Sequence, residues 1–196
     1  MKPHASNCLR QREQGFSLIT TLVLLVIASL LGVAASQLVL MSERSSRYDR
    51  DRLIAFQAAE AALLDAEMDI RGPGSMRAAL FSPTSITGFE DGCSNAGMTR
   101  GMCLPASLSA RPVWSTVSFT DTTRTVAFGD YTGRKYATGE SGVQPARTPR
   151  YIIEVIQDHS PGSNVGAQRH LYRVSAVGFG PREETQVMLQ MFFRKE

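Results

Sequence analysis

The sequence predicts an α+β protein in which one long N-terminal helix packs on a C-terminal antiparallel sheet. Three observations predict this class: an uncharged apolar run over residues 16–41, a helical period that continues to residue 71, and apolar strand-like segments after residue 150. The 196 residues leave room, beside the apolar run, for one folded domain of ordinary size.

The apolar run begins at Phe16, directly after Gly15, and the next charged residue is Glu43. At a rise of about 1.5 Å per residue it makes a helix of roughly 39 Å, longer than a ~30 Å hydrocarbon core. A secretory signal has a shorter apolar core and a small-residue cleavage site behind it. We therefore expect a retained membrane anchor, with any cleavage in front of it, after Gly15.

The net charge of the chain lies largely in its first residues. The formal charge is +3, and residues 1–15 hold three basic residues and one acidic residue, which leaves +1 for the remainder. Nucleic-acid binding requires a clustered basic patch. We therefore predict no nucleic-acid partner for this chain.

The segment after the anchor has apolar residues three and four positions apart, which predicts an amphipathic helix whose apolar face packs on the sheet. These residues are Phe56, Ala59, Leu63, Ala66 and Ile70. Asp51, Asp65 and Asp69 lie off this series, so we expect them to be solvated. The helix is expected to end at Arg71, because Gly72 suits a left-handed position and the following proline cannot continue a helix.

The middle of the chain has weaker signals. We expect a helical turn at 77–81, a turn-rich segment at 88–104, β-type structure at 114–128 and an exposed loop at 129–148. Trp114 is expected to be an aromatic residue of the core or of an interface. The predicted organisation comprises a leader (1–15), a transmembrane or fibre-core helix (16–41), an amphipathic continuation (42–71) and a globular domain (72–196).

The C-terminal part has three strand-like segments, near 151–156, 171–179 and 186–193, and their short connections favour an antiparallel meander. The last segment has apolar residues on both faces, so we expect it to be covered on both faces in places. Glu154 and Arg173 fall in mid-strand and are expected to form a surface ion pair.

Two of the three cysteines lie in the turn-rich segment. Cys93 and Cys103 are expected to form a disulfide in an oxidising compartment, worth about 3 kcal/mol by loop-closure entropy. A metal pair is the alternative, but there is no second cysteine pair and the three histidines are scattered. The sequence also lacks H-E-x-x-H, P-loop and G-x-S-x-G patterns, so we expect no catalytic residue, cofactor or metal.

Several of these segments resemble a known family. The leader, Gly15, Phe16 and the apolar run together resemble the class III signal of type IV prepilins. Residues 32–67, above all FQAAEAAL at 56–63, resemble the N-terminal domain of PilX-type minor pilins. The C-terminal segments PRYIIEVI, HLYRVSAVGFG and VMLQMFFR resemble the end of the same proteins.

The resemblance implies a type IV pilin-like fold and a structural role. A prepilin peptidase would cut after Gly15 and N-methylate Phe16. The protein would span the inner membrane once, contact its lipid, keep its C-terminal domain in the periplasm and later enter the pilus fibre, at its tip. Its partners would be other minor pilins and the major pilin, with which it would prime or cap type IV pilus assembly and so support twitching motility and adhesion.

One residue departs from the family pattern. Thr20 stands where most pilins carry a glutamate, which pairs with the N-terminal ammonium of a neighbouring subunit; an unpaired ammonium in an apolar core is costly. The departure favours a priming or tip role. The alternative is that threonine is simply tolerated at this position, because the helix packs well without the acid. The departure also leaves open the tip pseudopilin of a type II secretion system. A third alternative is a membrane-anchored periplasmic binding protein or hydrolase.

Overall fold

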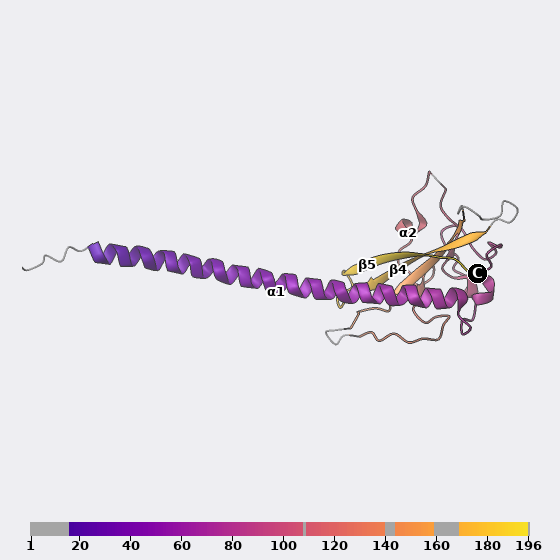
Figure 1. Cartoon of the computed structure of the whole chain (residues 1–196), viewed down its shortest axis with the longest axis horizontal. Helices are drawn as coiled ribbons and strands as arrows, with labels where there is room; N and C mark the ends of the chain where they lie inside the picture. The colour runs from indigo at the N-terminus through magenta and orange to yellow at the C-terminus, as the bar shows by residue number, and fades with distance from the viewer. Residues whose placement is uncertain (1–15, 108, 140–143, 159–168, 196) are drawn as a thin grey trace, which may run out of the picture. The chain divides into compact units, whose positions relative to one another are not determined.

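The computed structural model describes residues 16–107, 109–139, 144–158 and 169–195 (Figure 1). Two compact units make up the chain: the first ends at Arg47 and the second begins at Tyr48. Helix α1, which covers Phe16–Arg71, contributes to both units.

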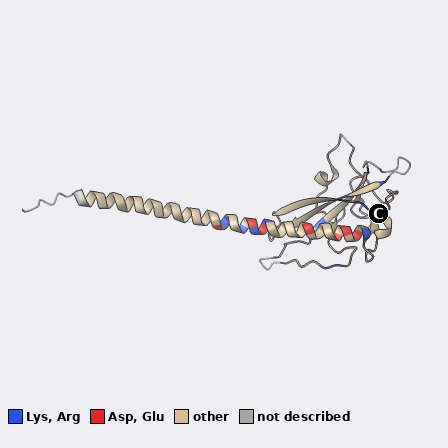
Figure 2. Cartoon of the chain, in the orientation of Figure 1, with Lys and Arg blue, Asp and Glu red and all other residues tan. Residues whose placement is uncertain are grey.

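The first unit contains the apolar part of α1, where every described side chain from Leu18 onward is exposed. By length and composition α1 can cross a membrane, and its most apolar window has a mean hydropathy of 2.6. The hydroxyls of Thr21, Ser29 and Ser36 donate to carbonyls one turn earlier, at 2.9, 2.8 and 2.9 Å. These bonds satisfy the hydroxyls inside the helix, as an apolar surrounding requires. Figure 2 shows that charged residues on α1 begin only after this segment.

In the second unit the buried face of α1 is not quite the predicted one. It is rotated about the helix axis, so that its centre lies about one residue earlier in the sequence. Its fully buried apolar residues are Ala55, Ala58, Ala59, Ala62, Ala66 and Ile70. Asp51, Asp65 and Asp69 lie on this same face and are at most 6% exposed, so the prediction that they are solvated was wrong. Phe56, predicted to be packed, is 39% exposed. The cause is the small size of alanine, which lets the helix backbone approach the sheet closely.

Helix α1 ends at Arg71, as predicted, but Gly72 is not among the residues with positive φ, so the predicted left-handed conformation was wrong. The amide of Gly72 instead donates to the carbonyl of Met68 at 2.6 Å. A short 3-10 helix, η1 (Ala78–Leu80), provides the helical turn expected nearby, and a second one, η2, covers Gly97–Thr99.

Within the described residues the sheet has five strands, and three of them form the predicted antiparallel meander: β3 (Arg150–Gln157), β4 (His170–Phe179) and β5 (Gln186–Phe193). The strand order is β1-β3-β4-β5, with β2 (Val126–Ala127) also pairing with β3. Strand β1 (Met102–Cys103) runs parallel to β3. The sheet is therefore mixed, where the sequence predicted an antiparallel one.

The expected β-type segment at 114–128 is mostly not strand. It begins inside a short helix, α2 (Val113–Thr116), and contributes only β2 to the sheet. Phe119, together with Val113 just before the segment, is buried beside Ile152 and Phe179 on the face of the sheet opposite α1, whereas Val126 belongs to the core cluster on the α1 face. Trp114 packs against the cluster that contains Phe119, as expected of a core aromatic.

Strand β4 brings α1 and the sheet into close contact at Gly178. A Cβ placed there would lie 2.1 Å from the carbonyl oxygen of Ala55 and 2.3 Å from the amide nitrogen of Ala59. Only a glycine fits this space without moving the helix. The alanines of α1 and this glycine together allow the helix backbone to lie close to the sheet.

Two side-chain predictions in the meander need correction. Glu154 and Arg173 do pair across β3 and β4, with contacts of 2.7 and 3.0 Å, but Glu154 is fully buried because β1 runs beside it. The pair is therefore not a surface pair. On β5, Met188 is 38% and Phe192 65% exposed, so the second face of this strand is not covered by the described part of the chain.

Candidate functional site

The candidate assembly region begins at the first residue of α1. Gly15 lies outside the described residues, so its cleavage remains a prediction. Phe16 is the first residue of the helix, and its side chain is likewise outside the described part. Thr20 lies four residues further on and is exposed. Cleavage after Gly15 would thus leave α1 intact.

Small residues accompany the large apolar ones in this exposed part of α1. A Cβ at Gly32 would meet no atom within 4 Å. Alanines and a serine lie on either side of it, at Ala28, Ala34, Ala35 and Ser36. Small residues of this kind let helices approach one another closely in an apolar environment. The first unit can therefore pack against lipid or against other helices.

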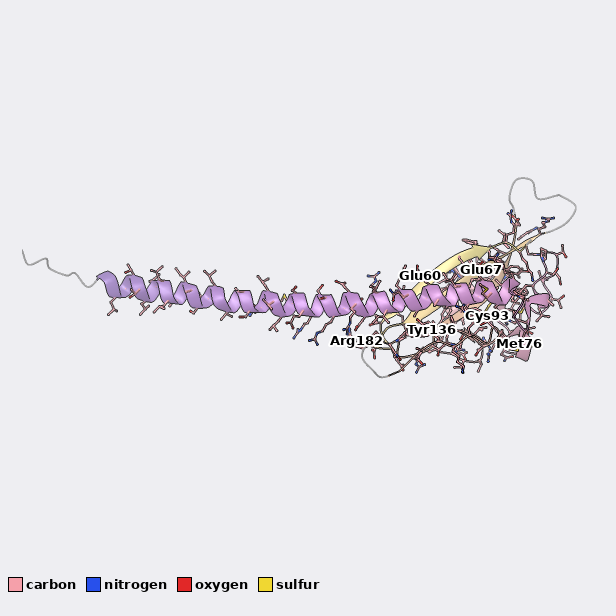
Figure 3. The ribbon with its side chains drawn as sticks, turned by 60° about the horizontal axis from the view of Figure 1, so that its bottom comes forward. Glu60, Glu67, Met76, Cys93, Tyr136 and Arg182 are labelled. Carbon is pink, nitrogen blue, oxygen red and sulfur yellow. A yellow bond between two sulfur atoms is a disulfide. The ribbon has the colours of Figure 1, made fainter. Side chains whose placement is uncertain are left out.

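The second unit holds the predicted disulfide. Cys93 and Cys103 are joined, and their Cα atoms lie 4.0 Å apart. Cys103 belongs to β1, whereas Cys93 lies in the preceding turn with a positive φ of 73°. The disulfide thus ties the loop 93–103 to the sheet. Figure 3 marks Cys93 in the folded unit.

A buried ion pair joins the end of α1 to this region, and the sequence analysis missed it. Arg77 is 1% exposed and Asp69 fully buried. The Arg77 Nε donates to both Asp69 oxygens, at 3.0 and 2.9 Å, and Nη2 donates to Oδ2 at 2.5 Å. The hydroxyl of Tyr151 donates to Asp69 at 2.8 Å. Burial, together with the nearby Asp69 charge, raises the pKa of Tyr151 well above its usual value, so the hydroxyl stays protonated.

The other side of the Arg77 guanidinium contacts the disulfide loop. Its Nη1 donates to the carbonyls of Met98 and Arg100, at 3.1 and 2.7 Å. The guanidinium carbon lies 3.7 Å from the ring centroid of Tyr131, whose hydroxyl donates to the Gly97 carbonyl at 2.5 Å. Arg77 therefore connects three segments: the end of α1, the loop 93–103 and the segment that follows β2.

Asp65 connects α1 to the predicted exposed loop at 129–148. Its carboxylate accepts hydrogen bonds from the Gly129 amide at 2.7 Å and the Thr132 hydroxyl at 2.6 Å. Burial raises the pKa of Asp65, and these hydrogen bonds and Arg134, 3.6 Å away, oppose that rise. Gly129 has a φ of +86°, and a Cβ there would lie 1.9 Å from the Arg134 carbonyl oxygen. The loop is thus fixed at its start, whereas 140–143 lie outside the described residues.

A signal for these buried carboxylates was present in the sequence. Asp51, Ala55, Ala58, Ala62, Asp65 and Asp69 follow one another at spacings of four and three residues. This series marks one helix face, but it contains only small and acidic residues. A prediction based on large apolar residues therefore does not identify this face as buried. In the described part of the chain, no group of three or more His, Cys, Asp or Glu side chains is arranged to hold a metal.

The fold and the exposed segment define a class of protein. A helix with an apolar, uncovered first part continues into a small α+β domain that is stabilised by a disulfide and buried ion pairs. Family models match both parts: PilX N-terminal over residues 14–64, and type IV pilus assembly protein PilX C-term over residues 87–195. The chain belongs to the PilX family of type IV pilus minor pilins. No curated protein and no solved structure matches it.

Proposed function

We propose that this chain primes or caps the assembly of a type IV pilus together with other minor pilins. The observation that carries the proposal is the apolar part of α1, whose described side chains are all exposed. Such a surface needs lipid before assembly and other helices after it. Because one apolar surrounding replaces the other, the uncharged and mostly apolar run 16–41 can leave the bilayer without exposure to water.

Processing by a prepilin peptidase would prepare the subunit. The enzyme would cut after Gly15 and methylate Phe16, which is the first residue of α1. The folded unit would lie in the periplasm, where an oxidising environment maintains the Cys93–Cys103 disulfide. The subunit would span the inner membrane once and then enter the fibre.

Mass spectrometry of the N-terminus of the mature protein, purified from cells with the pilus system, tests this proposal. We expect a chain that starts at a methylated Phe16. A mature protein that still carries residues 1–15 would contradict the pilin function and favour a membrane-anchored periplasmic binding protein or hydrolase.

Thr20 supports a place at the tip of the fibre. A subunit without the usual acid cannot pair its own carboxylate with the N-terminal ammonium of a neighbouring subunit. The loss of this pair matters least at the tip of the fibre, where no further subunit follows. The same residue favours a second candidate, the tip pseudopilin of a type II secretion system. Deletion of the gene separates the two: we expect loss of surface pili, and with it of twitching motility and adhesion. Loss of protein secretion with normal piliation would support the pseudopilin instead.

A further inference from the structure

The Cys93–Cys103 disulfide is buried in the folded unit. Cys103 is fully buried, and Cys93 is 4% exposed. Both cysteines belong to the apolar cluster on the face of the sheet opposite α1, together with Ile152 and Phe179. Thiol–disulfide exchange requires one sulfur atom to attack another directly, so a disulfide in this position is closed to thiols and oxidants in solution.

Contacts with the sheet hold the loop 93–103 in place. At the end of the loop β1 pairs with β3, and the amide of Ile153 donates to the carbonyl of Gly101 at 2.9 Å. Inside the loop, the amide of Gly101 donates to the carbonyl of Ser94, also at 2.9 Å. The sulfur atoms become accessible only when these contacts open.

Arg77 holds the same loop from the side of α1, and it depends on the loop in return. Its buried guanidinium uses the carbonyls of Met98 and Arg100 as acceptors, and the hydroxyl of Tyr131 binds the carbonyl of Gly97. These carbonyls converge on the guanidinium only when the loop is closed. An open loop would leave buried donors of Arg77 without acceptors, which is costly.

The cross-link favours the closed form of the loop. Cys93 has a φ of 73°, a left-handed conformation that few residues other than glycine adopt without a constraint. The bond to Cys103 is such a constraint, and it joins the first residue of the loop to β1, its last element. The closed loop then presents its carbonyls to Arg77. Docking of the loop is therefore easier for the oxidised chain than for the reduced one.

We infer that the Cys93–Cys103 disulfide forms before the loop 93–103 docks on Arg77 and β3, and that docking then closes the disulfide to further exchange. An oxidant with a reactive disulfide, whether a protein or a small molecule, must act on the chain while the loop is still open. This order is independent of the proposed pilus function, because it concerns only the folding of the second unit.

The oxidation is balanced by the oxidant alone. The thiolate of one cysteine attacks the disulfide of the oxidant, which forms a mixed disulfide and releases one sulfur of the oxidant as a thiolate. The thiolate of the second cysteine attacks the mixed disulfide, so that Cys93 and Cys103 are joined and the other sulfur of the oxidant leaves. The two protons lost by the cysteines end on the oxidant, which becomes a dithiol or two thiols.

A redox switch is the alternative role for this cysteine pair. Regulatory disulfides are exposed or strained, because they must be reduced in the folded protein. The burial of both cysteines and the contacts of the loop with Arg77, Tyr131 and Ile153 favour a permanent cross-link instead.

Reduction of the folded full chain in detergent measures how well the disulfide is shielded. Cys8→Ser removes the third cysteine of the sequence, so that alkylation and mass spectrometry count only the thiols of this pair. We expect dithiothreitol to reduce the folded chain at least about 100-fold more slowly than the chain in urea, because reduction must wait for the loop to open. The reduction of oxidised glutathione in both solutions corrects for the effect of urea on the chemistry. Equal corrected rates would overturn the inference.

A mild variant tests whether the docked loop is the shield. Tyr131→Phe removes the hydroxyl that donates to Gly97 and keeps the ring beside the Arg77 guanidinium, so the chain should still fold. We expect its disulfide to be reduced about fivefold faster than in the wild type, because one hydrogen bond that closes the loop is lost. Tyr136→Phe is the matched control: its ring packs on Phe128, outside the loop, and the rate should not change. Equal rates in the two variants would contradict shielding by the docked loop.

Trp114 reports the order of the two events. It is the only tryptophan in the sequence, and it packs against the cluster that contains both cysteines. The reduced chain is diluted from urea into detergent with oxidised glutathione, and samples are quenched with an alkylating reagent. We expect the fluorescence of Trp114 to reach its native value only as cross-linked chains appear. A complete fluorescence change while both thiols still react with the reagent would overturn the inference.

Discussion

Three buried aspartates connect α1 to the rest of the second unit. Asp51 accepts from Arg182 at 3.1 Å, Asp65 accepts from the start of the loop after β2, and Asp69 pairs with Arg77. Burying a carboxylate is costly unless hydrogen bonds and opposite charges compensate it. Each aspartate has such partners, and each partner belongs to a different segment, so the three together fix which segments lie against the helix.

Removing the fully buried cation should be far more costly than removing a partly exposed one. Arg77→Met leaves Asp69 buried without its ion-pair partner, and we expect a loss of about 3–5 kcal/mol in the free energy of unfolding. Arg100→Met is the matched control: the Arg100–Asp130 side chains are 31 and 32% exposed, so we expect a loss of at most about 1 kcal/mol. Urea unfolding of the full chain in detergent measures both; equal losses would contradict a special role for Arg77.

The aspartates also show which features of the fold local sequence patterns predict and which they do not. The helical period correctly predicted α1 and its end at Arg71, because that signal is local. The phase of the buried face was missed because alanine and aspartate carry it. The partners of Asp69 and Asp65 lie 8, 82 and 64 residues away, at Arg77, Tyr151 and Gly129, and no local pattern announces such pairs.

At the scale of elements, the packing of α1 on β4 depends on the absence of a side chain at Gly178. Gly178→Ala places a methyl group 2.1 Å from the Ala55 carbonyl oxygen, so helix and strand must separate. We expect a loss of about 1–3 kcal/mol or more in unfolding free energy, as for other overpacked cores. Gly74→Ala, where a Cβ meets no atom within 4 Å, is the control and should be nearly neutral. Thermal unfolding compares the two; equal unfolding temperatures would contradict the close contact.

The disulfide acts on a second element, strand β1. Replacing Cys93 and Cys103 by serine should lower the free energy of unfolding by about 3 kcal/mol, since the unfolded chain gains loop freedom without the cross-link. β1 has only two residues to pair with β3, so we also expect hydrogen exchange in loop 93–103 to become faster in this variant than in the wild type, and to change more than in β4. Unchanged exchange there would mean that Arg77 alone holds the loop.

The whole chain combines two parts whose sequence signals differ in strength. The uncharged run and the three strands of the meander were predictable because each is long and continuous. Strands β1 and β2 have two residues each, too few for a periodic signal, and no local pattern predicts the parallel pairing of β1 with β3. The candidate anchor was thus predicted from sequence, whereas the place of β5 at the end of the strand order emerged only from the structure.

The tip hypothesis for the whole subunit can be tested at Thr20, an exposed residue near the start of α1. Thr20→Glu introduces a carboxylate that, at a tip, has no following ammonium to pair with. A charge in an apolar surrounding costs about 2.5–3.5 kcal/mol by membrane-insertion scales. We therefore expect at least about tenfold fewer surface pili by electron microscopy, a factor that corresponds to 1.4 kcal/mol. Thr20→Gln, similar in size but uncharged, is the control and should assemble normally. Normal piliation with Thr20→Glu would place the subunit within the shaft instead, where the ammonium of a following subunit donates hydrogen bonds to the carboxylate.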